Sequence, residues 1–292
     1  MCHQLKVYFS FLVVCMSLYA SAIAQYEINK EAIKLVDSAN AAFCKNDTAA
    51  TIAILESIEK LYPTDAAVAI SNKALADLYI AQGRIKEAKE KIWYGISYKR
   101  TTIPVFPQMK ECSQLLSNRK WLEAKAESCV SLSRLYIQEK QFDSSLYYLQ
   151  QAQTTFNPYK LCGNGYYMYC VYLSPFFADH YLAMGDTTKA IARLLDFFMN
   201  HDGNTELITR KLKALLLQKY TQEQITAAVK KGLRNVSFTR VEGNDDTWYM
   251  NFTWFGLTTQ YYAGSKSELK EYKKLYISDP SAKMLCDASV RL

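Results

Sequence analysis

The sequence has few histidines and none of the short motifs that mark many enzyme and metal-binding families. Histidine occurs three times, at His3, His180 and His201. No HExxH, GxSxG, GxGxxG or Walker-type phosphate-binding motif is present. The cysteines do not group into the CxxC pairs that structural zinc sites use. We therefore expect no catalytic residue, no metal site and no cofactor.

Long apolar runs are confined to the N-terminus. A weakly basic head, residues 1–6, precedes a nearly unbroken apolar stretch at 7–19, and the small residues Ala22 and Ala24 follow. This order is typical of a secretory signal peptide, and a run of about a dozen residues is too short to span a bilayer. We expect residues 1–24 to be removed and the protein to be exported, to the periplasm, the cell envelope or the medium.

A lipid anchor at Cys15 is a less favoured alternative. Lipoprotein sites resemble a pattern with Gly, Ala or Ser directly before the cysteine, and Val14 is none of these. No later segment approaches the roughly 18 uncharged apolar residues of a transmembrane helix. We expect no transmembrane segment after signal removal, which leaves peripheral association with the envelope open.

The net charge of +7 raises the question of a nucleic-acid partner. Acidic and basic residues alternate, however, in stretches such as 83–92 and 267–274. Such alternation is typical of a solvated helix face, and export also argues against nucleic acid. We expect no nucleic-acid partner.

Export makes disulfide bonds possible for the cysteines that follow the signal segment. Cys162 and Cys170 flank the sequence GNGYYMY, whose glycines would let the chain turn back and close a bridge. The same two residues would equally serve as small core side chains. The sequence leaves both interpretations of this pair open.

Residues 74–92, ALADLYIAQGRIKEAKEKI, contain two apolar stripes with helical spacing. Gly83 separates them and suits a helix-ending turn, because glycine adopts positive φ without steric cost. The stripes consist of Leu75, Leu78 and Tyr79 before the glycine, and of Ile85, Ala88 and Ile92 after it.

The same outline recurs downstream when the chain is aligned on Tyr79, Tyr136 and Tyr181. Positions four before and thirteen after the tyrosine are large, and positions three before and nine after it are small, which allows two helices to approach closely. The large positions are Leu75, Leu132 and Phe177, then Ile92, Leu149 and Leu194; the small ones are Ala76, Ser133 and Ala178, then Ala88, Ser145 and Ala190.

This series resembles the tetratricopeptide repeat (TPR), in which paired helices stack into a solenoid. Two weaker copies flank the three matches, at 35–63 with Phe43 in the tyrosine position and at 206–233 with Tyr220 near it. The resemblance covers about two thirds of the chain. It implies a mainly α fold with a TPR-like domain at residues 25–235.

The matched tyrosines are 57 and 45 residues apart, whereas the family period is about 34 residues. The first interval offers an extra helix or a long first helix for the next unit. We expect the second interval to contain a loop that includes Asn157-Pro158 and the sequence LCGNGYY, residues 161–167.

The C-terminal region, 236–292, changes to a period of two. Trp248, Met250, Phe252 and Trp254 share one face of a predicted β-hairpin, and short helices at 265–277 and 281–290 follow as a cap. Tryptophans exposed on a hairpin would form a binding surface. The favoured alternative is a hydrophobic plug that closes the end of the solenoid.

In the TPR family the first helix of each pair lines a concave groove. The position two residues before the tyrosine faces this groove in the family. The resemblance therefore implies groove-facing side chains at Asp77, Arg134 and Asp179. Lys73 and Tyr172 face inward on the same register. Solvated helix residues are the alternative. The carboxylate clamp of chaperone-binding members is not implied, because Asp77 and Asp179 stand where an amide would be needed.

These observations favour an exported, non-enzymatic scaffold that binds a protein or peptide partner through its groove or its C-terminal hairpin. Residues 61–88 also resemble the repeats of outer-membrane assembly lipoproteins, so an outer-membrane assembly or peptidoglycan-associated scaffold is an alternative. A helical-repeat hydrolase that uses an Asp/Glu pair from separate repeats is another.

Overall fold

The computed structural model describes residues 30–63, 65, 67–97, 112–159, 163–199, 205–240 and 246–289, without the side chains of 112–121, 163 and 164. The expected signal peptide, Cys15, Cys162 and His201 lie outside these residues. Among the helices of these ranges, none combines the length and apolar character that a membrane crossing requires.

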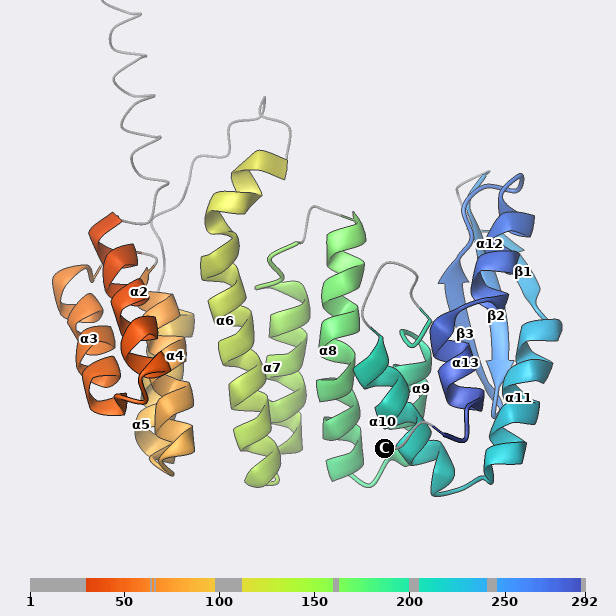
Figure 1. Ribbon diagram of the computed structural model, residues 1–292, viewed down its shortest axis with the longest axis horizontal. Coiled ribbons are helices and arrows are strands. Elements are labelled where there is room, and N and C mark those ends of the chain that lie inside the picture. Colours follow the sequence, from red (N-terminus) through yellow and green to blue (C-terminus); the bar gives the residue numbers. More distant parts are fainter. Residues whose placement is uncertain are drawn as a thin grey trace, which may run out of the picture. The chain divides into compact units, whose positions relative to one another are not determined.

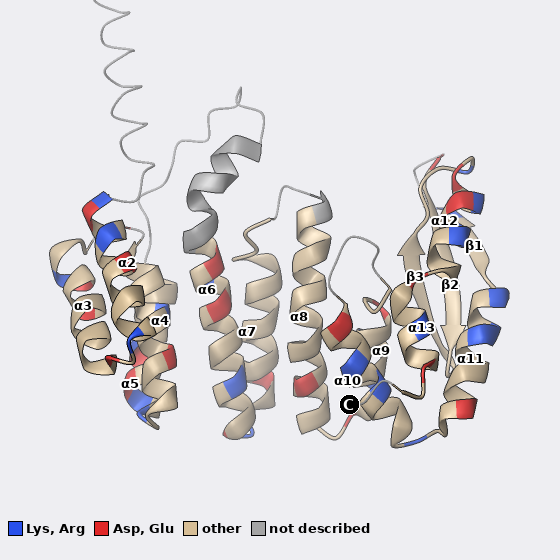
Figure 2. Ribbon diagram, in the orientation of Figure 1, with Lys and Arg blue, Asp and Glu red and all other residues tan. Residues whose placement is uncertain are grey.

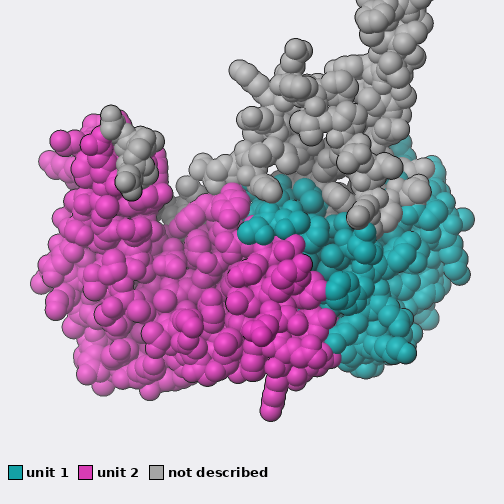
Figure 3. Space-filling view, turned by 180° about the vertical axis from the view of Figure 1, so that it is seen from behind, with its two compact units in different colours: residues 1–132, 154–162 teal, residues 133–153, 163–292 magenta. Residues whose placement is uncertain are grey.

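The described chain is mainly α-helical, with a small antiparallel sheet near its C-terminus (Figure 1). It forms two compact units, one of residues 1–132 and 154–162 and the other of residues 133–153 and 163–292 (Figure 3). The helices are α2 (Lys30–Cys44), α3 (Thr48–Leu61), α4 (Ala67–Ala81), α5 (Ile85–Ser97), α6 (Cys112–Gln138), α7 (Phe142–Thr154), α8 (Gly163–Ala183), α9 (Thr187–Leu195), α10 (Glu206–Leu217), α11 (Gln222–Arg234), α12 (Leu269–Ile277) and α13 (Pro280–Cys286).

The turns that join α2 to α3, α4 to α5, α6 to α7 and α8 to α9 share one backbone geometry. Each contains a residue in the left-handed region: Asn46 (φ 59°), Gly83 (73°), Lys140 (59°) and Gly185 (79°). The next N–H donates to a carbonyl five residues back, as in a Schellman motif. The accepting carbonyls are those of Ala42, Tyr79, Tyr136 and Tyr181, at 3.0, 2.8, 2.8 and 2.8 Å.

The predicted small and large positions are buried in the three matched hairpins. The small residues of the first and second helices are covered, as are the large residues thirteen positions after each tyrosine. These are Ala76, Ser133, Ala178, Ala88, Ser145, Ala190, Ile92, Leu149 and Leu194. The size alternation therefore marks the contacts between paired helices, as the sequence pattern predicts.

The register expected for the first hairpin is wrong by one residue. The carbonyl that accepts the turn hydrogen bond belongs to Ala42, whereas Phe43 is 57% exposed. An aromatic side chain was the sequence cue, but the left-handed residue Asn46 fixes the turn. Asparagine tolerates that conformation better than most residues, so the backbone sets the register here.

The helix pair that precedes the sheet, α10 and α11, is joined by a different turn. Tyr220 follows α10 instead of lying inside it, and its N–H donates to the Leu216 carbonyl at 2.8 Å. Thr221 and Gln224 then form a reciprocal capping box at the start of α11. The weak copy predicted at 206–233 is thus a helix pair, but Tyr220 does not occupy the tyrosine position of the other hairpins.

The irregular intervals of the repeat are filled in part by long helices. α6 has 27 residues, which agrees with the long-first-helix alternative. α8 begins at Gly163, so the loop expected to extend through residue 167 is helical from 163 onward. The apolar and aromatic composition of this segment lets it pack as a helix. Its two glycines lie in the first turn of α8, where they destabilise the helix little.

The C-terminal sheet has three antiparallel strands in the order β1 (Ser237–Arg240), β2 (Trp248–Trp254) and β3 (Leu257–Tyr262). The predicted hairpin corresponds to β1 and β2. β3 was not anticipated. It follows a two-residue turn in which Phe255 and Gly256 have φ of 51° and 80°, the geometry of the tight hairpin turns that match strand twist.

One face of the sheet completes the hydrophobic core of the second unit. Met250, Phe252 and Trp254 are fully buried, and Trp254 lies edge-on to the ring of Phe198 with centroids 5.3 Å apart. The plug interpretation therefore describes this face. Trp254 has no exposed surface and so cannot contact a partner, contrary to its prediction as a binding residue. Trp248 is half-buried with its indole N–H enclosed.

Candidate functional site

A partly exposed aromatic cluster lies on α8, the first helix of the α8–α9 hairpin. This helix is apolar around most of its circumference, and one side packs into the core through residues such as Val171 and Ala178. The ring centroid of Tyr172 lies 5.6 Å from that of Tyr169, which is buried, and 5.6 Å from that of Phe176, which is partly buried. Tyr172 is 45% exposed. We call these three residues the α8 aromatic strip.

A charged pair lies one turn beyond the strip. The ammonium of Lys211, on α10, forms an ion pair with the Asp179 carboxylate and donates to the Pro175 carbonyl at 3.2 Å. The Asp179 side chain is half-exposed, so it lies at the surface as the sequence predicts. Its charge is compensated by a residue 32 positions away, which the sequence pattern did not indicate.

Arg134, on α6, is exposed, and its side chain forms no hydrogen bond or ion pair with another described residue. The predicted residues of the second unit therefore share exposure but differ in environment. Tyr172 joins an aromatic cluster, Asp179 is paired, and Arg134 is a solvated cation.

In the first unit, Lys73 and Asp77 pair with each other on α4, and Lys73 lies 3.8 Å from the Glu127 carboxylate of α6. The Lys73 side chain is largely covered, whereas that of Asp77 is half-exposed. The predicted charges of this surface are therefore satisfied locally, which favours the solvated-face interpretation for Asp77, whereas Lys73 is covered.

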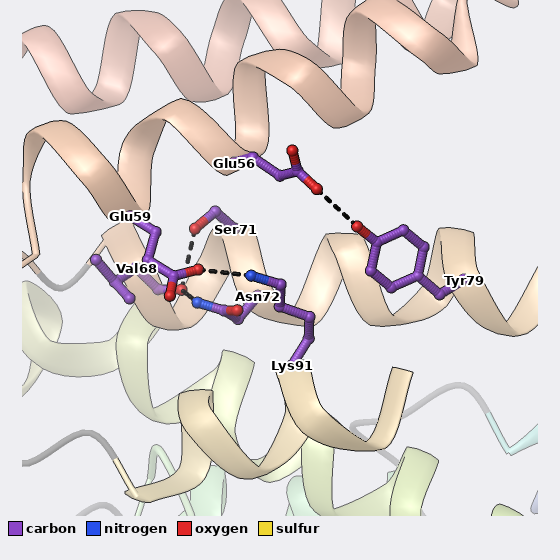
Figure 4. Close-up of polar contacts among 7 residues, drawn as sticks. All are labelled: Glu56, Glu59, Val68, Ser71, Asn72, Tyr79 and Lys91. Carbon is purple, nitrogen blue, oxygen red and sulfur yellow. Dashed lines mark hydrogen bonds and ion pairs between the residues drawn. The ribbon is translucent and has the colours of Figure 1, made fainter. Parts of the chain in front are cut away.

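Polar contacts across α3, α4 and α5 were not anticipated (Figure 4). The Tyr79 hydroxyl donates to Glu56 at 2.8 Å, and Lys91 pairs with Glu59 at 2.7 Å. Burial of Tyr79 and its bond to Glu56 raise the pKa of the phenol. Because the partners come from neighbouring hairpins, no spacing rule within one helix could have found them.

His180 is enclosed in a chain of small polar side chains. Its Nδ1 lies 3.0 Å from the Ser145 hydroxyl, which lies 2.8 Å from the Ser133 hydroxyl, and all three residues are buried. Burial lowers the pKa of His180, and the charge of Asp143 opposes this shift. A serine beside a histidine is a nucleophile–base pair only where substrate can reach it. These buried hydroxyls instead pack at the small positions of the helix pairs.

A surface hollow of about 390 Å³ lies where α8, the end of α9 and β3 meet. The described residues that line it are Tyr167, Asp196, Phe197, Thr258 and Gln260. A glycosidase-type site needs two carboxylates about 5 to 10 Å apart. Asp196 is the one carboxylate among these lining residues, so the hollow does not provide the pair that the hydrolase alternative requires.

Cys170 is a buried free thiol in the structure. Burial raises its pKa, which lowers the reactivity of the sulfur because the thiolate is the reactive form. Its expected partner Cys162 lies outside the described residues. In its described surroundings, Cys170 behaves as a small core residue.

No protein-family model matches the sequence, and no curated protein is significantly similar to it.

Proposed function

We propose that this protein is an exported, non-enzymatic helical-repeat scaffold of the TPR type that binds a segment of a partner protein on the α8 aromatic strip. The observation that carries the proposal is the exposure of Tyr172 beside the buried ring of Tyr169 and the partly buried ring of Phe176, on a long helix that packs into the core. Tyrosine is enriched among the residues that dominate the binding energy of protein interfaces.

The strip favours a partner segment that presents apolar or aromatic side chains. Because Lys211 neutralises Asp179 beside it, the strip itself attracts no particular charge, and the ion pair supplies a polar rim. Its rings lie on a helix of 21 residues that is fixed by the core below. Few scaffold side chains would lose freedom on binding, and this preorganisation favours affinity.

The TPR assignment rests on the size alternation in the sequence and on the four turns of common geometry. Export rests on the N-terminal sequence pattern. Mass measurement of the mature N-terminus tests the export proposal: a chain that begins at Gln25 without lipid is expected, whereas an acylated Cys15 would favour the anchored outer-membrane scaffold.

Site-specific photo-crosslinking tests the binding surface. A photoreactive phenylalanine analogue in place of Tyr172 should crosslink one partner from an extract of the source cell envelope. The control places the same analogue at Tyr147, which is 53% exposed on α7 of the same unit. Tyr147 should give no specific product.

Once the partner segment is identified, Tyr172→Ala should weaken its affinity about tenfold, a typical loss for a central aromatic contact. Tyr147→Ala should leave the affinity unchanged. Equal crosslinking at both positions, or no product at Tyr172, would contradict the proposal.

A further inference from the structure

A second surface, on α11 and α12, has a different character. A hollow of about 420 Å³ is lined by Lys230, Leu233 and Arg234 of α11 and by Lys273 and Ile277 of α12. The α11 residues have the spacing i, i+3, i+4 and the α12 residues the spacing i, i+4, so each set shares one face of its helix. We call this surface the cationic hollow. Figure 2 shows the basic residues along these two helices.

The three cations of the hollow have no acidic partner within the described chain. The side chains of Lys230, Arg234 and Lys273 form no hydrogen bond or ion pair with a described residue, whereas Lys73, Lys91 and Lys211 each have a carboxylate partner. The described lining contains no acidic residue. A concave surface lined by one sign of charge concentrates its field and attracts ligands of the opposite sign.

The helix dipole accounts for only part of this arrangement. Arg234 lies in the last turn of α11, where a cation is favoured. Lys273 comes from another helix, and the dipole of α11 does not explain why it faces the same hollow. The convergence of charges from two helices therefore calls for a ligand-based explanation.

The two apolar residues of the cationic hollow limit the kinds of ligand that would fit it. Leu233 is half-buried, and Ile277 is 46% exposed beside the cations. A free phosphate ion would leave both without a contact. A membrane surface is broad and flat, whereas these cations line a hollow. A peptide with carboxylates on both sides of an apolar residue would satisfy the charges and the apolar contacts together.

We propose that the cationic hollow binds an acidic segment of a partner protein, anchored by an apolar side chain on Leu233 and Ile277 and held by Lys230, Arg234 and Lys273. This site goes beyond the function proposed above, because it lies on other helices and takes a ligand of different chemistry. The two sites can therefore succeed or fail separately.

Selection from a displayed library of short random peptides tests this proposal with the purified full-length protein. Peptides that contain at least two acidic residues beside a leucine, isoleucine or phenylalanine should be enriched. The best peptide, measured by fluorescence polarisation, should bind Lys230→Gln/Lys273→Gln at least about tenfold more weakly, because close charge pairs at an interface contribute strongly.

The matched control is Lys231→Gln/Lys274→Gln. It removes the same charge from adjacent positions on the same helices that do not line the hollow, and it should change affinity by less than about twofold, since exposed charges are screened by salt. Ile277→Ser should reduce the preference for peptides that contain an apolar residue. Tyr172→Ala should have no effect. Circular dichroism should show the same fold for every variant.

Four results would overturn the proposal. Enriched peptides without acidic residues, or no enrichment over the Lys230→Gln/Lys273→Gln variant, would exclude an acidic segment. An equal loss in the control pair would assign binding to net charge alone. Binding to phosphatidylglycerol vesicles that depends on Lys230 and Lys273, with no acidic peptide enriched, would assign the hollow to a membrane surface.

Discussion

We predict that replacement of glycine by alanine has opposite effects on stability at two glycines in equivalent helix positions. Gly95 in α5 and Gly232 in α11 are each third from the end of a helix of 13 residues. In a helix, replacement of glycine by alanine normally stabilises the folded state by about 0.5 to 1 kcal/mol, because the unfolded chain loses freedom. That gain should be similar at both positions, so the surroundings decide the sign.

At Gly232 a Cβ atom would lie 3.0 Å from the Thr253 carbonyl oxygen and 3.3 Å from two indole carbons of Trp254. Both neighbours are fixed, one as strand backbone and the other as a fully buried ring. Overpacking of this kind costs about 1 to 3 kcal/mol. At Gly95 the nearest atom is the Cβ of Asn72 at 3.5 Å, an ordinary contact.

We therefore expect Gly232→Ala to reduce the free energy of unfolding by roughly 0.5 to 2 kcal/mol, the overpacking cost less the helix gain. Gly95→Ala should raise it by about 0.5 kcal/mol. Urea denaturation followed by circular dichroism measures both. Hydrogen exchange should locate the loss of protection in the second unit, which contains α11 and β2, because the chain forms two compact units.

A Gly232→Ala variant whose free energy of unfolding is not lower than that of the parent would refute the close approach of α11 to β2. An equal loss in Gly95→Ala would assign the effect to the helix end and not to the contact with Trp254.

Two further predictions concern Lys140 and Lys125. Lys140 has φ of 59° at a helix-ending turn, so Lys140→Gly should stabilise the fold by about 0.5 to 1 kcal/mol through relief of strain; a lower melting temperature in thermal denaturation would contradict this. Lys125 is buried, donates to the Ile96 carbonyl at 2.8 Å, and has its pKa lowered from 10.5 to about 8 by burial. Between pH 8 and 10.5 the unfolded chain therefore binds more protons than the folded chain, so the free energy of unfolding rises with pH, by up to about 3 kcal/mol. Below pH 8 the lysine is charged in both states, and the full cost of burying the charge remains. Urea denaturation at pH 7 and pH 10 should show this rise in the parent but not in Lys125→Met; equal pH dependence would contradict it.

The sequence determined the features that depend on neighbouring residues. The apolar spacing around Tyr79, Tyr136 and Tyr181 predicted the paired helices, and Gly83 predicted the left-handed turn. The alternation at 248–254 predicted a strand with one buried face. Each of these features follows from local periodicity or from the conformational freedom of one residue.

Features that depend on residues distant in sequence became visible only in the tertiary structure. The sequence placed Asp179 at the surface but could not supply its partner Lys211, and it offered Trp254 as a contact although β2 buries it against Phe198. The cationic hollow likewise requires residues of α11 and α12 to meet, about 40 positions apart. The physical reason is that a helix or strand pattern fixes which side chains share a face, whereas packing against other elements decides whether that face is buried, paired or left open to a partner.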